Sequence, residues 1–249
     1  MKTRQIIVIS LLAILLCSQV SFAQPVPLPR VEIGVGMATE PEEVAQSLQI
    51  LALLTILTLA PAILMLMTSF TRIVIVLGFV RNALATQQTP PNQVLIGLAL
   101  FLTFFIMAPT WQVINEQALQ PYFAGQLAQP EALARVDSAV RNFMLTYTRE
   151  KDLELFVSVR GERPASVDDI PTVQLIPAFV ISELKTAFQM AFILFIPFIV
   201  IDMIVASALM SMGMLMLPPV MISLPFKILL FVLVDGWHLI TRSLLLSFQ

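Results

Sequence analysis

Residues 210–219 read Met-Ser-Met-Gly-Met-Leu-Met-Leu-Pro-Pro, and they separate two long apolar segments within residues 175–248. A helix rises about 1.5 Å per residue, so each segment is long enough to cross a hydrocarbon core about 30 Å thick. Gly213 and the pair Pro218 and Pro219 favour a loop between the segments. The pattern predicts a helical hairpin with a methionine-rich loop at its tip.

Four methionines alternate with other residues in this loop. In an extended loop their side chains project to one side, whereas on a helix they are distributed around the axis. Thioether side chains are flexible and polarisable, which suits a surface that closes around changing shapes and also suits irregular gaps in a core. The sequence therefore leaves two interpretations, a gate and core packing, for Met210, Met212, Met214 and Met216.

The composition places the chain far from soluble globular proteins. Of its 249 residues 58% are hydrophobic and 12% are charged, and the mean hydropathy is +0.89. These values indicate an integral membrane protein or a protein buried in a membrane assembly. The formal net charge of -2 gives no reason to expect nucleic-acid binding, and the single Cys17 excludes a disulfide within the chain.

No catalytic signature is present in the sequence. It contains no glycine-rich phosphate loop, no His-Glu-x-x-His motif and no cluster of Cys and His. A serine nucleophile would have only the distant His238 as a base. We expect a protein that is not an enzyme and that has no catalytic residues, no cofactor and no bound metal.

The N-terminus resembles an export signal. Basic residues precede the apolar run 6–17, and Ser21 and Ala23 are small residues at the two positions that a signal peptidase inspects. Residues 1–23 are predicted to be a cleaved signal peptide, with an uncleaved anchor helix as the alternative. Residues 24–43 are rich in Pro and Gly and are expected to form a flexible periplasmic N-terminus.

The rest of the chain is predicted to form an all-α, membrane-associated fold. Residues 44–116 form a first helical hairpin, in which Pro61 is expected to kink the first helix. Residues 117–172 are polar and form a small, mostly helical domain on the periplasmic side. Its six Lys and Arg residues oppose this orientation, whereas the signal peptide supports it. Residues 173–249 form the second hairpin, whose methionine-rich loop is placed at 210–217.

Four charged residues of the second hairpin stand out, because an ion at membrane depth costs about 2.5 to 3.5 kcal/mol. Glu183 and Lys185 are two positions apart and face different sides of a helix. Their partners are expected on another helix or another subunit, unless both residues reach water at the membrane interface. Asp202 and Lys227 come to similar depth if the hairpin turns at the methionines, so a salt bridge is favoured over a proton relay or a neutral acid at Asp202.

Several long motifs resemble one family of membrane proteins, the FliP/SctR export-gate family of type III secretion, and the flagellar members in particular. The likeness extends from about Val44 to the end of the sequence. It rests on residues 210–219 and on Pro177-Ala-Phe-Val-Ile-Ser-Glu-Leu-Lys-Thr-Ala-Phe188, Pro225-Phe-Lys-Ile-Leu-Leu-Phe-Val-Leu-Val-Asp-Gly-Trp237, Leu59-Ala-Pro-Ala-Ile-Leu-Met-Leu-Met-Thr-Ser-Phe-Thr-Arg72 and Gln87-Gln-Thr-Pro-Pro-Asn-Gln-Val94.

The resemblance implies a structural subunit of the flagellar export gate in the bacterial inner membrane, within the flagellar basal body. Five copies would line a channel for unfolded flagellar proteins, together with FliQ-like and FliR-like subunits and a FlhB-like switch protein. It also implies that Met210, Met212, Met214 and Met216 form a gasket that closes the channel. Glu183 and Lys185 are then candidates for ion pairs between subunits.

Three other functions are compatible with parts of the sequence. An injectisome export gate would share the architecture, although its members tend to be shorter. A Cu(I) transporter would use thioether ligands, but the membrane segments offer no supporting Cys or His cluster. An ion-conducting subunit would use Asp202 as a relay.

Overall fold

The computed structural model describes residues 41–86, 88–159, 161, 166–214 and 216–249, with side chains from Leu48 onward. The predicted signal peptide, residues 1–23, lies outside the described residues. Residues 24–40 of the predicted N-terminal segment also lie outside them. The chain divides into two compact units, Met1–Leu51 and Ala52–Gln249. All the helix packing described below belongs to the second unit.

The first apolar run forms two helices, α2 (Pro41–Met67) and α3 (Phe70–Ala83). Pro61 lies inside α2, and the break comes later, at Thr68 and Ser69. The Thr68 hydroxyl donates back to the Leu64 carbonyl and accepts a hydrogen bond from the Phe70 N–H at 3.3 Å. A hydroxyl that accepts from the backbone N–H two residues further on offers the chain an alternative to the helical pattern, and the helix is interrupted at this point, whereas it continues through Pro61.

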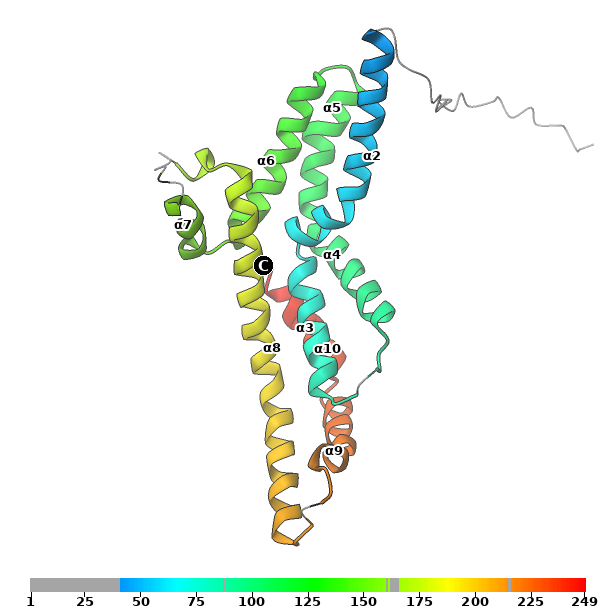
Figure 1. The fold of residues 1–249 in the computed structure, drawn as a ribbon, viewed down its shortest axis with the longest axis vertical. Coiled ribbons are helices and arrows are strands. Elements are labelled where there is room, and N and C mark those ends of the chain that lie inside the picture. The colour runs from blue at the N-terminus through cyan, green and yellow to red at the C-terminus, as the bar shows by residue number, and fades with distance from the viewer. Residues whose placement is uncertain (1–40, 87, 160, 162–165, 215) are drawn as a thin grey trace, which may run out of the picture. The chain divides into compact units, whose positions relative to one another are not determined.

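Helix α4 (Asn92–Ile114) runs antiparallel to α3 and packs against it (Figure 1). The turn between them is fixed by Arg81, whose Nη1 donates to Asn92 Oδ1 at 2.5 Å. A π-helical turn, η1 (Asn115–Leu119), and the short α5 (Gln120–Phe123) continue α4 without a gap.

The polar segment between the apolar parts contains α6 (Gln129–Tyr147), α7 (Glu150–Val159) and the 3-10 turn η2 (Val167–Asp169). Both α6 and α7 pack against the long helix that follows. Arg141 of α6 donates to the Thr172 hydroxyl at 2.7 Å and to the Ile170 carbonyl at 2.6 Å. The predicted domain at residues 117–172 is therefore joined closely to the helices around it within the second unit.

The second apolar part contains α8 (Thr172–Ser211), α9 (Pro219–Leu233) and α10 (Gly236–Leu246). Helix α8 has 40 residues, about 60 Å at the helical rise, which exceeds the thickness of a hydrocarbon core. Helix α9 returns antiparallel along α8 (Figure 1). Helices α9 and α10 meet at an angle of 63°, so the predicted second arm of the hairpin is two helices.

The bend between α9 and α10 depends on Asp235 and Gly236. Asp235 has a φ of 51°, in the left-handed region that few residues other than glycine, Asn and Asp enter readily. A side-chain carbon on Gly236 would lie 2.3 Å from the Phe231 ring. The missing side chain of Gly236 thus lets the aromatic ring of α9 close over the start of α10.

Three described helical stretches are long and apolar enough to span a membrane: Leu48–Met67, Asn92–Phe123 and Thr172–Ser211. The bent pair α9 and α10 adds a fourth if it counts as one span. No strand occurs in the part of the chain that the structure describes. The all-α, membrane-associated fold class is confirmed, whereas the predicted simple hairpins are interrupted at residues 68–69 and 234–235.

Candidate gate and buried ion pairs

The methionine tip begins with an ordered end of α8. Gly213 has a φ of 76°, its N–H donates to the Met210 carbonyl at 3.0 Å, and the Met214 N–H donates to the Leu209 carbonyl at 3.0 Å. These two bonds form a Schellman motif, in which a left-handed glycine ends the helix. Met210 is still helical, so the loop is not extended from residue 210 as the alternation of methionines suggested.

All four methionines of the tip are exposed in the chain. Their exposed fractions are 60% for Met210, 63% for Met212, 42% for Met214 and 98% for Met216. They therefore do not fill gaps in the core of their own chain, and the core-packing interpretation fails for this conformation of the chain. The tip instead presents adaptable apolar side chains to whatever surrounds it.

Asp202 and Lys227 form an ion pair between α8 and α9. Lys227 Nζ lies 2.7 Å from Asp202 Oδ2, and the Ser223 hydroxyl donates to Asp202 Oδ1 at 2.5 Å. The Lys227 side chain is 3% exposed and that of Asp202 is 30% exposed. The pair has the partners that the hairpin geometry suggested, and Ser223 is an addition that the sequence analysis did not identify.

Glu183 is paired within its own chain. Arg72 of α3 donates through Nε to Glu183 Oε2 at 2.9 Å, and its Nη2 donates to Glu183 Oε1. The side chains are 3% and 0% exposed. Because both carboxylate oxygens are occupied inside the chain, the predicted intersubunit role does not suit Glu183, whose ion pair is a buried link between α3 and α8.

Arg72 also holds residues near the C-terminal end of α10. Its Nη1 donates to the Ser247 carbonyl at 2.8 Å and to the Ser247 hydroxyl at 3.0 Å. The guanidinium carbon lies 3.8 Å from the centroid of the Phe248 ring, a stacking contact that attracts a cation to an aromatic face. Tyr147 of α6 donates its hydroxyl to the Phe248 carbonyl at 2.8 Å. One arginine thus joins α3, α8 and the residues after α10, and Phe248 links them to α6.

A second polar cluster joins α7 to α8 one residue before Glu183. The Ser182 hydroxyl donates to Asp152 Oδ2 at 2.6 Å and accepts from the Arg149 N–H at 3.1 Å, while Arg149 Nη2 lies 2.5 Å from the same carboxylate. Burial raises the pKa of Asp152, but the bonds from Ser182 and Arg149 and the charges of Arg149 and Lys185 outweigh it. The pKa of this carboxyl therefore lies below its usual range.

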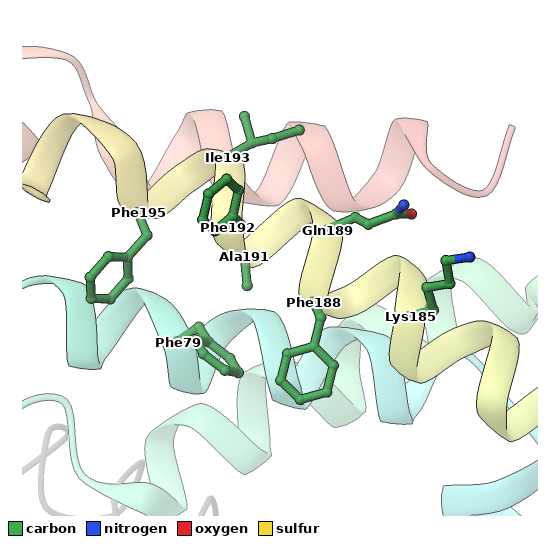
Figure 2. A pocket seen from close by; sticks show the side chains of 8 residues that line it. All are labelled: Phe79, Lys185, Phe188, Gln189, Ala191, Phe192, Ile193 and Phe195. Atoms are coloured by element: carbon green, nitrogen blue, oxygen red, sulfur yellow. The ribbon is translucent and has the colours of Figure 1, made fainter.

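Lys185 differs from the other three charged residues of the set. It is exposed, and the structure gives it no hydrogen bond or ion pair within the described part of the chain. It stands at one end of a pocket of about 840 Å³ between α8 and α3, whose other walls include Phe79 and Phe188 (Figure 2). A partner for Lys185 on another subunit stays a prediction.

The sequence analysis missed Arg72 as a site residue. The signal was present, because an arginine within an apolar run requires a partner, and Glu183 was the acid without one. Their separation along the chain gave no indication of the match. Ser182 and Ser223 could be found only once the helices were packed.

Comparison with known proteins gives consistent matches. A model of the FliP family matches residues 53–244. The flagellar biosynthetic protein FliP of Bacillus subtilis (strain 168) is 60% identical over 217 residues, which cover 87% of this chain and 98% of that protein. The protein of the same name from Aquifex aeolicus is 49% identical over 225 residues, which cover 89% of this chain and 92% of that protein. The one from Caulobacter vibrioides is 45% identical over 247 residues, which cover 99% of this chain and 92% of that protein.

Proposed function

Because the chain belongs to the FliP family, we propose that it is a structural subunit of the flagellar type III protein export gate. In this role it lines the channel through which unfolded flagellar proteins cross the inner membrane. The match over residues 53–244 carries the proposal. The flagellar name of the relatives favours a flagellar gate over an injectisome gate.

The chain is membrane-associated, and its long apolar helices are poorly covered by the rest of the described chain. Exposed apolar surface of this extent needs either lipid or neighbouring protein. We infer that neighbouring protein covers much of this surface. The neighbours are further copies of this chain, five in all, with FliQ-like and FliR-like subunits and a FlhB-like switch protein. The segment 117–172 is then periplasmic, after a signal peptide at residues 1–23 has been removed.

The methionine tip supports a closing element within that assembly. Its four thioether side chains are exposed, while the Schellman motif at Gly213 fixes the backbone that carries them. A ring of such tips would present flexible apolar groups that can close against each other and yield to a passing chain. The gate proposal therefore assigns Met210, Met212, Met214 and Met216 to the seal.

The test combines assembly with ion leak. The double variant Met212→Ala and Met214→Ala should assemble as the unaltered chain does but let ions through the resting gate. The matched control is Met203→Ala with Met65→Ala, which removes two exposed methionines outside the tip. Unaltered conductance in the tip variant, with assembly intact, would contradict the seal.

Native mass spectrometry of the chain, alone and with its neighbouring small membrane proteins, tests the assembly itself. A homopentamer that gains those subunits supports the export gate. A monomer or dimer that ignores them contradicts the proposed assembly, and Cu(I) dialysis of that species would then test the copper interpretation of the methionines directly.

A further inference from the structure

The end of α8 that carries the methionine tip extends beyond the helices packed on the rest of α8. Arg72 of α3 meets Glu183 of α8, and further along both helices Phe79 meets Phe188, so α3 and α8 run in the same direction. Helix α3 ends about 11 residues after Arg72, close to the level of residue 194 on α8, because both helices rise by the same amount per residue. The rest of α8 projects past the end of α3, with α9 beside it (Figure 1).

The projecting part of α8, residues 198–211, is joined to α9, and together they are called the arm below. The ion pair of Asp202 with Lys227 links the two helices. Nearer the base of the arm the rings of Phe198 and Phe231 contact each other, with centroids 6.4 Å apart. Links at two levels prevent the two helices from moving separately, so the arm behaves as one piece.

Helix α10 belongs to the body of the helix bundle and not to the arm. Its residues Ile240 and Leu244 are buried in the same core as α3. Arg72 of α3 donates to the Ser247 carbonyl at 2.8 Å, and the same arginine fixes α8 to the body at Glu183. The chain therefore leaves the body along α8 and returns to it at the start of α10.

Both crossings between body and arm interrupt the regular helical hydrogen bonds. Pro197 lies inside α8 and has no N–H, so the carbonyl of Ile193 loses its helical donor. At the other crossing α9 and α10 meet at an angle of 63°, and Asp235 between them has a φ of 51°, in the left-handed region. Helices bend at such points more readily than within an unbroken ladder of hydrogen bonds.

The two crossings face each other across an apolar recess of about 260 Å³. Pro197 and Gly236 both line it, together with Val80 near the end of α3. The Phe231 ring of the arm lies over Gly236, 2.3 Å from the place that a side-chain carbon would take. Protein interiors are close-packed and leave helices little room to move. Here, by contrast, a recess adjoins both crossings, and the ring of the arm rests on backbone that has no side chain to interlock with it.

We propose that Pro197 and Gly236 form a paired hinge about which the arm swings relative to the body. The recess gives room for the swing, and the Phe231 ring slides over Gly236. From Pro197 to the end of α8 the arm is about 21 Å long, so a bend of about 20°, the size of a helix kink, moves the methionine tip by about 7 Å. The hinge depends only on packing within this chain, whereas its use to open a seal rests on the proposed function.

Double electron–electron resonance on the full chain in detergent, diluted with unlabelled chain, tests the hinge. Nitroxide labels are attached to cysteines introduced into a Cys17→Ser background. Two pairs join the body to the arm, Phe101 with Met203 and Phe101 with Leu229, and one pair stays within the body, Phe101 with Leu133; all four positions are exposed. The two distances that end on the arm should be distributed more broadly than the distance within the body, and equally broadly.

A proline variant tests where the arm bends. Pro197→Ala restores the missing N–H and should narrow both arm distances to the width of the body distance. The matched control is Pro177→Ala, which removes the other proline inside α8, next to the buried Phe179, and should leave both widths unchanged.

Three results would overturn the proposal. The first is an arm distance as narrow as the body distance in the unaltered chain, and the second is a width that Pro197→Ala leaves unchanged. The third is a broad distance for only one of the two arm positions, which would show that the arm does not move as one piece. None of these measurements uses secretion or conductance, so failure of the hinge is separate from failure of the proposed function.

Discussion

Arg72 and Glu183, 111 positions apart in the sequence, meet in a two-point ion pair between α3 and α8 that is closed to solvent. Each residue alone would be costly within an apolar helix. Together they satisfy each other, and Ser247 takes the remaining nitrogen of the guanidinium. The pair therefore specifies how α3 and α8 are aligned, because any sliding of one helix along the other separates two buried charges.

Glu183→Gln should strongly destabilise the chain, because it leaves the buried Arg72 without a counter-charge. Breaking a buried ion pair in this way costs about 3 to 5 kcal/mol. The control is Glu131→Gln, which breaks the exposed pair with Arg135 and should cost at most about 1 kcal/mol. Thermal unfolding in detergent measures both, and equal losses would show that the buried pair does not hold α3 on α8.

The ion pair between Asp202 and Lys227 should respond unequally to removal of its two partners. Lys227 is almost fully buried, whereas Asp202 retains contact with solvent. Asp202→Ala leaves a buried ammonium unpaired, but Lys227→Met leaves a carboxylate that can be hydrated and still accepts from Ser223. The free energy of unfolding should therefore fall more in Asp202→Ala than in Lys227→Met; the reverse order would contradict the geometry.

A variant of Asp202 tests whether this carboxylate relays protons. If the carboxylate only anchors Lys227 and Ser223, Asp202→Asn keeps one oxygen to accept from the Lys227 ammonium, and its NH2 group can donate to the Ser223 hydroxyl, which then donates to the Val220 carbonyl. It removes the counter-charge of Lys227, so the variant should assemble and secrete at a reduced but measurable level. Complete loss of secretion in a variant that assembles normally would favour the relay. A secretion assay with a parallel measurement of assembly separates these outcomes.

The helical, membrane-associated class followed from the sequence because apolar length and composition determine it directly. The breaks did not follow, since they depend on local hydrogen bonds. The sequence pointed to a kink at Pro61, whereas the interruption of the helix comes at Thr68, whose hydroxyl accepts from the Phe70 N–H. Likewise, the bend at Gly236 depends on the Phe231 ring, which only the folded chain brings into place.

The site residues were predictable to different degrees. The match of Asp202 with Lys227 follows from the two arms of one hairpin, which place residues at equal distance from the tip side by side. Glu183 has its partner in a distant segment, and no local pattern in the sequence indicates which cation will meet it. The exposure of the methionines required the structure, because alternation alone fits both a core and a surface.

Acid should loosen the contact between α7 and α8. The pKa of Asp152 is lowered in the folded chain, so its ionised form contributes stability above its ordinary pKa of about 4. This contribution is lost as the pH falls through the lower, folded-state pKa. Hydrogen exchange of α7 amides between pH 6 and 3 should show faster exchange at the acid end, beyond the intrinsic pH effect. Asp152→Asn should lose this dependence, whereas Glu154→Gln on the same helix should keep it.

Gly236→Ala should disturb the bend between α9 and α10. The added carbon would lie 2.3 Å from the Phe231 ring, so the ring or the helix must move, and overpacking of this kind costs about 1 to 3 kcal/mol. Gly78→Ala is the matched control, because a side-chain carbon at Gly78 meets no atom within 4 Å. Unfolding of both variants measures the difference, and equal stability would mean that Phe231 adapts without cost.

Gly213→Val should loosen the methionine tip while leaving the rest of the chain folded. The residue has a φ of 76°, where an ordinary side chain costs about 1 to 2 kcal/mol and a β-branched one is a marked outlier. The strain acts on the two bonds that end α8, from Gly213 to Met210 and from Met214 to Leu209. Gly213→Asn is the control, since asparagine accepts the left-handed conformation at the end of a helix. Hydrogen exchange at Gly213 and Met214 should therefore rise in the valine variant and change little in the asparagine variant. If the tip seals a channel, ion leak should also be greater in the valine variant than in the asparagine variant. Equal leak in both variants would show that the seal does not depend on the backbone conformation of this turn.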